Sequence, residues 1–299
     1  MSEHHHHHHL EVSGKTIGLL LLSFAINMLL SIAEIVGGLI SGSVALIGDA
    51  LHNTSDALSI LVAVIAFKIG GKKADSKYTY GFKRAEIIGG FINLILLFIS
   101  GCYLVVEGIE RLIKPENIDG MIIIWISVLA LIIDIATAKI SHHDSHHSHN
   151  MKMLFIHNLA DAFGSIGVIV SGICILWWRA YWVDGVIALV IAAYMIWQSV
   201  VSFKPIVNIL MNAAPDNINL DDVKKAIAKI KGVEDVHHLH LWSLGEHETA
   251  LECHVVADNV AVVQKIAKKL DDKFAIEHCN VQVETERKCC NCSCCENSE

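Results

Sequence analysis

Six long apolar stretches constrain this sequence more than any other feature. A helix crosses a bilayer with roughly 20 predominantly apolar residues, and each stretch is long enough to do so. Of the 299 residues, 53% are hydrophobic and only 18% are charged, whereas about a quarter of a soluble domain is charged. The sequence therefore predicts a polytopic α-helical membrane protein with six transmembrane helices. These cover approximately residues 16–40, 45–68, 83–112, 118–140, 152–178 and 183–203.

The negative net charge of the chain argues against a nucleic-acid partner. The formal net charge is -8, whereas nucleic-acid binding needs basic side chains that neutralise phosphates, so no nucleic-acid partner is expected. The first apolar stretch is too long for the apolar part of a secretion signal and lacks a small-residue cleavage site. We therefore interpret it as a retained span.

The basic residues predict the orientation, because Lys and Arg concentrate in the cytoplasmic loops of membrane proteins. The connection between the second and third spans is rich in them, and Lys139 and Lys152 flank the connection between the fourth and fifth. The opposite side has only Arg111, Lys114 and Arg179. We therefore expect both termini to be cytoplasmic, which agrees with six spans.

After Lys204-Pro205 the composition changes to short alternating runs with more charges. The pattern predicts a helix capped by Asn219 or Asp216, two strands, a second helix and a last strand, an α-β-β-α-β order that suits a small α+β domain. The predicted elements are residues 219–231, 233–244, 249–257, 259–274 and 280–286. The predicted divisions of the chain are an N-terminal segment 1–15, a membrane domain 16–205, a cytoplasmic α+β domain 206–286 and a Cys-rich tail 287–299.

The most informative motif lies inside the predicted membrane domain. His52 and Asp56 are four residues apart in the second span, and His157 and Asp161 repeat that spacing in the fifth. A separation of four places both side chains of a pair on one helix face. Ionisable residues at membrane depth are costly and face a cavity or a partner. Two such pairs can converge into one His₂Asp₂ site, a ligand set that suits Zn²⁺.

Hydrogen bonding between helices is the alternative reading of these polar residues, although the repetition of the motif favours a metal site. The same ambiguity applies to Asn27, Glu34 and Asp134, for which a hydrogen bond to a neighbour is one reading and a part in proton or metal movement is the other. Asp49 lies one turn from His52 and is a candidate to support the site.

Four segments together resemble the cation diffusion facilitator family, most closely its zinc-transporting branch. They are the paired H-x-x-x-D spans, Gly42-Ser43-Val44-Ala45-Leu46, Thr79-Tyr80-Gly81-Phe82-Lys83-Arg84-Ala85-Glu86 and Val236-His237-His238-Leu239-His240-Leu241-Trp242-Ser243. The resemblance implies a homodimer with a cytoplasmic metallochaperone-like domain, and Zn²⁺/H⁺ antiport out of the cytoplasm by alternating access. It also implies that His52, Asp56, His157 and Asp161 are the transport ligands, and the histidine at position 52 favours zinc.

The chemistry of the ligands agrees with proton coupling. Zinc binds deprotonated imidazole and carboxylate, so metal that enters the site must displace protons, and protons arriving from the other side can displace the metal. The resemblance further implies a second zinc site in the cytoplasmic domain, with His237, His254 and His278 as ligands and Glu284 as a possible one. His240 is as easily interpreted as a packed histidine, and a structural role for the whole histidine group remains open.

Two further segments are rich in metal ligands. A loop with His142, His143, His146, His147 and His149 predicts a metal-collecting segment, with a solvated polar loop as the alternative. Five cysteines near the C-terminus stay reduced in a cytoplasmic tail, which favours metal binding over disulfides. The run His4–His9 is as easily a purification tag as a native segment and carries no functional argument.

Three other functions compete with zinc export. An exporter of Cd²⁺, Co²⁺, Mn²⁺ or Fe²⁺ would use the same ligands, because a His₂Asp₂ site binds several divalent ions. A membrane-anchored metal sensor would bind metal without flux. An intramembrane metalloenzyme is disfavoured, because the sequence has no H-E-x-x-H motif.

Overall fold

The structure is a computed structural model that describes residues 14–70, 74–144, 149–245 and 248–285. It divides into two compact units, each of which is described by itself. The first unit combines Met1–Ile65 with Gly89–Ser202, and the second combines Ala66–Ile88 with Phe203–Glu299. The first therefore contains most of the apolar stretches, and the second contains the segment with mixed helices and strands.

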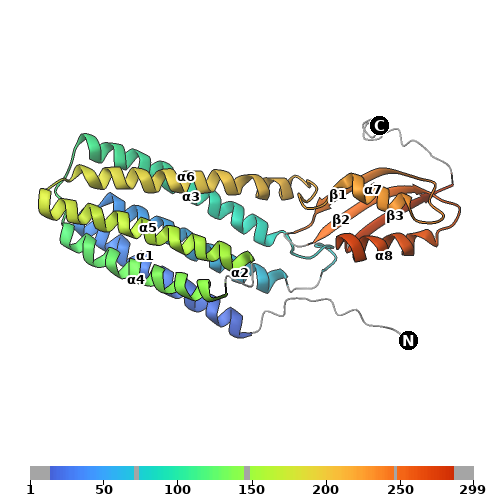
Figure 1. Ribbon diagram of the computed structural model, residues 1–299, viewed down its shortest axis with the longest axis horizontal. Coiled ribbons are helices and arrows are strands. Elements are labelled where there is room, and N and C mark those ends of the chain that lie inside the picture. The colour runs from blue at the N-terminus through green and yellow to red at the C-terminus, as the bar shows by residue number, and fades with distance from the viewer. Residues whose placement is uncertain (1–13, 71–73, 145–148, 246–247, 286–299) are drawn as a thin grey trace. The chain divides into compact units, whose positions relative to one another are not determined.

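Six long helices form at the six apolar stretches (Figure 1). They are α1 (Gly14–Ser41), α2 (Val44–Gly70), α3 (Ala85–Ile113), α4 (Gly120–Asp144), α5 (His149–Trp178) and α6 (Trp182–Leu210). Five of them are long and apolar enough, within the described residues, to cross a membrane. The exception is α2, whose polar residues include Asp49, His52 and Asp56, so a sixth span at α2 stays a prediction. Helix α6 continues through Pro205 to Leu210, beyond the predicted end of the membrane domain at residue 205.

The first unit has its apolar side chains on both its inside and its outside. A buried cluster includes Leu46, Leu104, Ile123 and Met195, which are almost completely inaccessible. Many large apolar side chains nevertheless point outward, among them Trp177, which is 72% exposed. In water the exposure of so many apolar side chains would be unfavourable. In lipid it is not, because the acyl chains are themselves apolar. This distribution is typical of a helical bundle surrounded by lipid.

Helices α4 and α5 lie side by side (Figure 1) and approach closely at a pair of glycines. A Cβ atom on Gly120 would lie 2.5 Å from the carbonyl oxygen of Gly172, and one on Gly172 would lie 3.1 Å from the carbonyl oxygen of Gly120. Small residues allow such close backbone approach between membrane helices. The two glycines therefore set how closely α5, which carries His157 and Asp161, packs against α4.

The start of α2 is held by a carboxylate from α6. Ser43 precedes the helix and accepts a hydrogen bond from the Leu46 backbone N–H at 3.1 Å, as an N-cap residue does. Its hydroxyl donates to Asp184 Oδ1 at 2.5 Å, while Asp184 Oδ2 accepts from the backbone N–H groups of Val44 at 2.8 Å and Ala45 at 3.3 Å. Asp184 is completely buried. A negative charge at a helix N-terminus is favourable, so Asp184 positions the helix that carries His52 and Asp56.

The second unit has the predicted α-β-β-α-β order. It consists of α7 (Leu220–Ala228), β1 (Asp235–Ser243), β2 (Thr249–Val256), α8 (Val262–Phe274) and β3 (His278–Glu284). The sheet order is β1-β2-β3, with β2 antiparallel to β1 and parallel to β3. Helix α7 contacts β1 and α8, and α8 contacts β3, so the two helices cover the sheet together. Ile227, Leu251, Ile266 and Leu270 lie in the resulting core.

Helix α7 begins where the sequence predicts, since Asn219 caps it and its side chain accepts a hydrogen bond from the Asp221 N–H at 2.9 Å. Strand β1 differs from the expectation. The predicted alternation from Val236 to Trp242 is interrupted by a β-bulge between His237 and His240, where His238 has a φ of 50°. The extra residue reverses which side chains face inward. As a result Val236 and Leu241 both lie in the core although they are five residues apart, whereas strict alternation would require an even separation.

Candidate metal centres

Helices α2 and α5 bring the two H-x-x-x-D pairs together. His52 Nε2 lies 3.0 Å from Asp161 Oδ1 and 3.5 Å from Asp56 Oδ2. His157 Nε2 lies 3.3 Å from Asp56 Oδ2 and 3.6 Å from Asp161 Oδ2. Each histidine therefore faces both carboxylates, one on its own helix and one on the other helix. Four side chains that are far apart in the sequence converge on one small space.

These distances match the spacing of ligands around a tetrahedral zinc ion. Ligand atoms about 2.0–2.1 Å from zinc lie roughly 3.3 Å from one another at the corners of a tetrahedron. His52, Asp56 and Asp161 each offer an atom, and the three atoms lie within 4.8 Å of one another. His157 lies next to this group through its contacts with both carboxylates. A divalent ion could occupy the space between the four side chains with little rearrangement.

The four side chains differ in exposure. His52 is nearly inaccessible, with 4% of its side chain exposed, whereas His157 is 30% exposed. The ring of Tyr194 on α6 packs edge-on against that of His52, with 5.4 Å between the ring centroids. The Nδ1 atom of His52 is buried without a hydrogen bond. Thus His52 lies at the closed side of the group and His157 at its more accessible side.

Two hydrogen bonds next to this group involve partners that the sequence analysis missed. Asn53 Nδ2 donates to Glu34 Oε2 on α1 at 2.9 Å, and Ser165 Oγ donates to Asp134 Oδ2 on α4 at 2.8 Å. Asn53 lies one turn after Asp49 and Ser165 lies one turn after Asp161, so the helical period provided a signal for both. Glu34 and Asp134 therefore each accept a hydrogen bond from a side chain on a neighbouring helix, which was one of the two interpretations of these residues.

Asp49 is also buried beside the group. Its Oδ1 atom lies 3.5 Å from the position that a Cβ on Gly164 would take, and its Oδ2 atom has no hydrogen bond. Asp49 on α2 therefore lies close to α5 at Gly164.

A second ligand group lies in the sheet of the second unit, near the start of β1 and the ends of β2 and β3. His237 on β1, His254 on β2 and Glu284 on β3 each offer an atom, and these atoms lie within 4.8 Å of one another. His237 Nε2 lies 3.3 Å from Glu284 Oε2, and His254 Nδ1 lies 3.1 Å from Glu284 Oε1. All three side chains are at least nine-tenths buried. The bulge in β1 is what turns His237 toward the other two.

The protonation state of His254 suits a metal ligand. Burial lowers the pKa of His254, and the neighbouring His238 lowers it further, which favours the neutral imidazole that binds metal. By contrast, burial raises the pKa of Cys253 to about 12 and that of Cys279 to about 11. Both thiols are therefore protonated at neutral pH, and the sheet's own cysteines are poor ligands.

The structure does not bring His278 to this group. His278 begins β3 opposite Ala250, whereas Glu284 ends the strand opposite Val256. The His278 side chain is about half exposed, its Nε2 lies 4.0 Å from Glu248 Oε2, and its ring packs edge-on against Tyr80. Of the four predicted cytoplasmic ligands, His237, His254 and Glu284 come together within one chain and His278 does not. His240 is exposed and its ring contacts that of His238.

The His-rich segment is only partly described. Residues 142–144 end α4 and His149 begins α5, so the helices extend into the predicted loop. His146 and His147 lie outside the described residues, as do the Cys-rich tail and His4–His9.

Comparison with known proteins agrees with this architecture. The family model described as "Cation efflux transmembrane domain" matches residues 20–211, and that described as "Cation efflux protein, cytoplasmic domain" matches residues 215–286. The chain is 33% identical over 276 residues to the "Cadmium, cobalt and zinc/H(+)-K(+) antiporter" of Bacillus subtilis, covering 89% of this chain and 88% of the relative.

Two further relatives extend the range of organisms. The chain is 34% identical to the "Metal cation efflux system protein CzcD" of Cupriavidus metallidurans, covering 85% of this chain and 82% of the relative. It is 31% identical to the "Proton-coupled zinc antiporter SLC30A8" of Xenopus laevis, covering 84% of this chain and 74% of the relative. The family models and these relatives extend over both units of the chain. This protein therefore belongs to the cation diffusion facilitator family of cation efflux proteins.

Proposed function

We propose that this protein exports divalent metal ions, with zinc as the main substrate, in exchange for protons. In this proposal six helices span the membrane, both termini are cytoplasmic, and the metal crosses through His52, Asp56, His157 and Asp161 by alternating access. The observation that carries the proposal is the geometry of these four residues, whose facing nitrogen and oxygen atoms are 3.0–3.6 Å apart.

The charges of the site explain why metal and protons should exchange. Two carboxylates inside a membrane domain are costly unless a positive charge compensates them. A divalent ion supplies that charge when it binds, and it requires both imidazoles to be deprotonated. Protons on the imidazoles supply the charge when the metal leaves, because each histidine lies within 3.6 Å of both carboxylates. Metal and protons are therefore alternative occupants of the same site.

The choice of metal follows from ligand chemistry. Nitrogen and oxygen ligands at tetrahedral spacing suit Zn²⁺, but the same set also binds Cd²⁺ or Co²⁺. The name of the Bacillus subtilis relative includes cadmium, cobalt and zinc, and that of the Xenopus laevis relative includes zinc and protons. These names support zinc as the substrate with cadmium and cobalt as further ones. Export of Mn²⁺ or Fe²⁺ is the alternative.

The test is zinc flux into proteoliposomes with an imposed pH gradient. We expect flux that depends on the gradient in the wild type and that falls at least a hundredfold in Asp161→Asn, which keeps the size of the side chain but removes a ligand charge. The control is Glu116→Gln, which removes an exposed carboxylate outside the site. Normal flux in Asp161→Asn would refute the site. Zinc binding without flux in the wild type would instead favour a membrane-anchored sensor.

The cytoplasmic group supports a second, resident metal. We propose that His237, His254 and Glu284 bind zinc in the cytoplasmic domain of a homodimer, where the metal regulates transport or stabilises the dimer. Both nitrogens of His237 are buried and lack a hydrogen bond, although carboxylate oxygens lie 3.3 Å away. Zinc retention should fall in His237→Gln and stay unchanged in His278→Gln, measured in the Asp161→Asn background so that the transport site does not contribute. Equal retention in both variants would contradict this assignment.

A further inference from the structure

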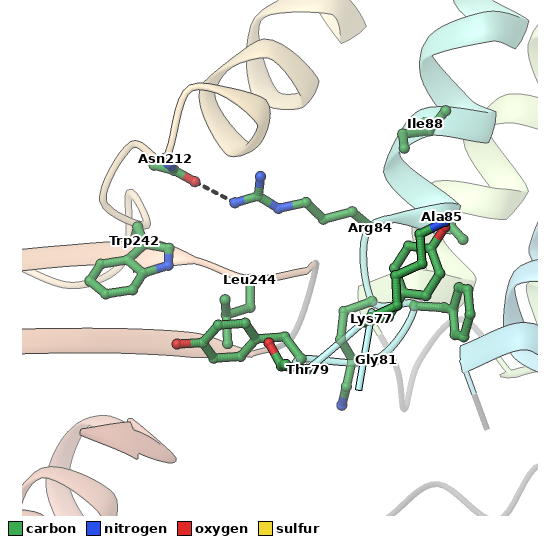
Figure 2. Close-up of a pocket in the computed structure, with 13 residues that line it drawn as sticks. Lys77, Thr79, Gly81, Arg84, Ala85, Ile88, Asn212, Trp242 and Leu244 are labelled. Atoms are coloured by element: carbon green, nitrogen blue, oxygen red, sulfur yellow. Dashed lines mark hydrogen bonds between the residues drawn. The ribbon is translucent and has the colours of Figure 1, made fainter. Parts of the chain in front are cut away.

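The second unit contains a cavity that neither metal centre uses. It has a volume of about 580 Å³. Its walls are the segment 77–84, the first turn of α3, Asn212 after α6, and Trp242 and Leu244 at the end of β1 (Figure 2). A space of this size accommodates a small ligand or the headgroup of a larger one. All of these residues belong to the second unit.

The lining of the cavity is positively charged. Among the described residues, the lining includes Lys77, Lys83 and Arg84 but no carboxylate. The Lys83 ammonium forms an ion pair with Glu248, which lies outside the lining. The Arg84 guanidinium donates to the side-chain oxygen of Asn212, which is a neutral partner (Figure 2).

Two described acids, Asp75 and Glu86, lie near the lining. Asp75, in the turn that precedes the lining segment, accepts hydrogen bonds from the backbone N–H groups of Lys77 and Tyr78 at 2.8 and 2.7 Å. Glu86 lies in the first turn of α3 but not in the lining. The lining also supplies neutral donors, namely the hydroxyl groups of Thr79 and Tyr80 and the indole N–H of Trp242. Lys77 and Arg84, together with these donors, form a suitable environment for a phosphate group.

The position of the cavity on α3 distinguishes a lipid phosphate from a dissolved one. Ala85 and Ile88 line the cavity and belong to the first turn of a candidate membrane span. Ile88 is 50% exposed, so an acyl chain whose headgroup occupies the cavity could contact Ala85 and Ile88 at the start of this span.

We propose that this cavity binds the phosphate headgroup of an anionic phospholipid in the leaflet on the side of the cytoplasmic domain. Lys77 and Arg84 provide the charge, and the aromatic side chains provide the amphipathic surface that is typical of a membrane interface. Ala85 and Ile88 contact the start of the acyl chain. A dissolved phosphate would use the cations but would gain nothing from these apolar side chains.

The experiment measures lipid retention and needs no transport, so it is independent of the proposed function. Purified full-length protein in detergent is mixed with phosphatidylcholine that contains phosphatidylglycerol, passed through a gel-filtration column, and analysed for bound phosphatidylglycerol by mass spectrometry. One cation near a membrane surface changes the affinity for an anionic lipid about fivefold. Lys77→Gln and Arg84→Gln should each weaken binding by about this factor, and Lys77, in an exposed turn, can be replaced with little risk to folding.

Three outcomes would overturn the proposal. Lys204→Gln removes an exposed cation on α6 that does not line the cavity, so an equal loss in this control would indicate general surface attraction. Displacement of phosphatidylglycerol by equimolar inorganic phosphate would indicate a site for dissolved anions. Equal retention of phosphatidylcholine, whose headgroup has no net charge, would show that the cations do not select the lipid.

Discussion

Replacing Asp184 with alanine should destabilise the membrane domain strongly, although Asp184 does not touch the candidate transport site. The carboxylate accepts three hydrogen bonds at the start of α2, from the Ser43 hydroxyl and from the Val44 and Ala45 N–H groups. Asp184 and Ser43 are completely inaccessible. Alanine would therefore leave three buried donors without a partner and without water to replace it.

The magnitude follows from the number and burial of these bonds. A hydrogen bond to a charged group contributes about 1.5–3 kcal/mol, and an unsatisfied buried donor costs about 1–3 kcal/mol. Because the three bonds share one carboxylate, they do not add fully. We expect Asp184→Ala to lower the free energy of unfolding by about 3–5 kcal/mol. At about 2–4 °C per kcal/mol, the midpoint of thermal unfolding should fall by about 10 °C.

Asp119 provides a matched control. It also caps a long helix, since its Oδ1 accepts from the Met121 N–H at 2.9 Å, but it is exposed. Asp119→Ala should cost only about 1 kcal/mol. The assay is the temperature at which the detergent-solubilised full chain loses its monodisperse gel-filtration peak. Asp184→Asn keeps one acceptor oxygen and should fall between wild type and Asp184→Ala. Equal shifts for Asp184→Ala and Asp119→Ala would refute the reasoning from burial.

Two further predictions concern packing and pH. Gly120→Ala should lower the free energy of unfolding by about 1–3 kcal/mol, because its Cβ would lie 2.5 Å from a backbone oxygen of α5. Gly18→Ala should be neutral, because no atom lies within 4 Å of the added Cβ. The same thermal assay compares the two variants, and equal effects would contradict the close approach of α4 and α5. The pKa of His254 lies below the usual value of about 6.5 because of burial, so its imidazole stays neutral as the pH falls from 7 to that value. Zinc at the cytoplasmic group should therefore half-dissociate below about pH 6.5 in equilibrium dialysis of the Asp161→Asn protein, and half-release above that pH would contradict the assignment.

Local periodicity determined much of this protein. Six apolar stretches were long enough to identify six helices, and the order of elements in the cytoplasmic domain followed from alternation, capping and turn residues. The spacing of four in each H-x-x-x-D pair indicated that its two side chains share a helix face, because that depends only on the helical period. For the same reason the cap at Asn219 was visible in the sequence.

Only the tertiary structure decided which residues meet across elements. The pairing of α2 with α5 at 3.0–3.6 Å depends on helix packing, and so does the burial of Asp184 against the first turn of α2. The bulge at His238 was not predictable, since strict alternation was the simplest reading of β1. That one extra residue turns His237 toward His254 and Glu284, while the parallel pairing of β3 with β2 leaves His278 at the opposite end. Local rules place side chains on a face, whereas contacts between faces depend on the packing of the whole chain.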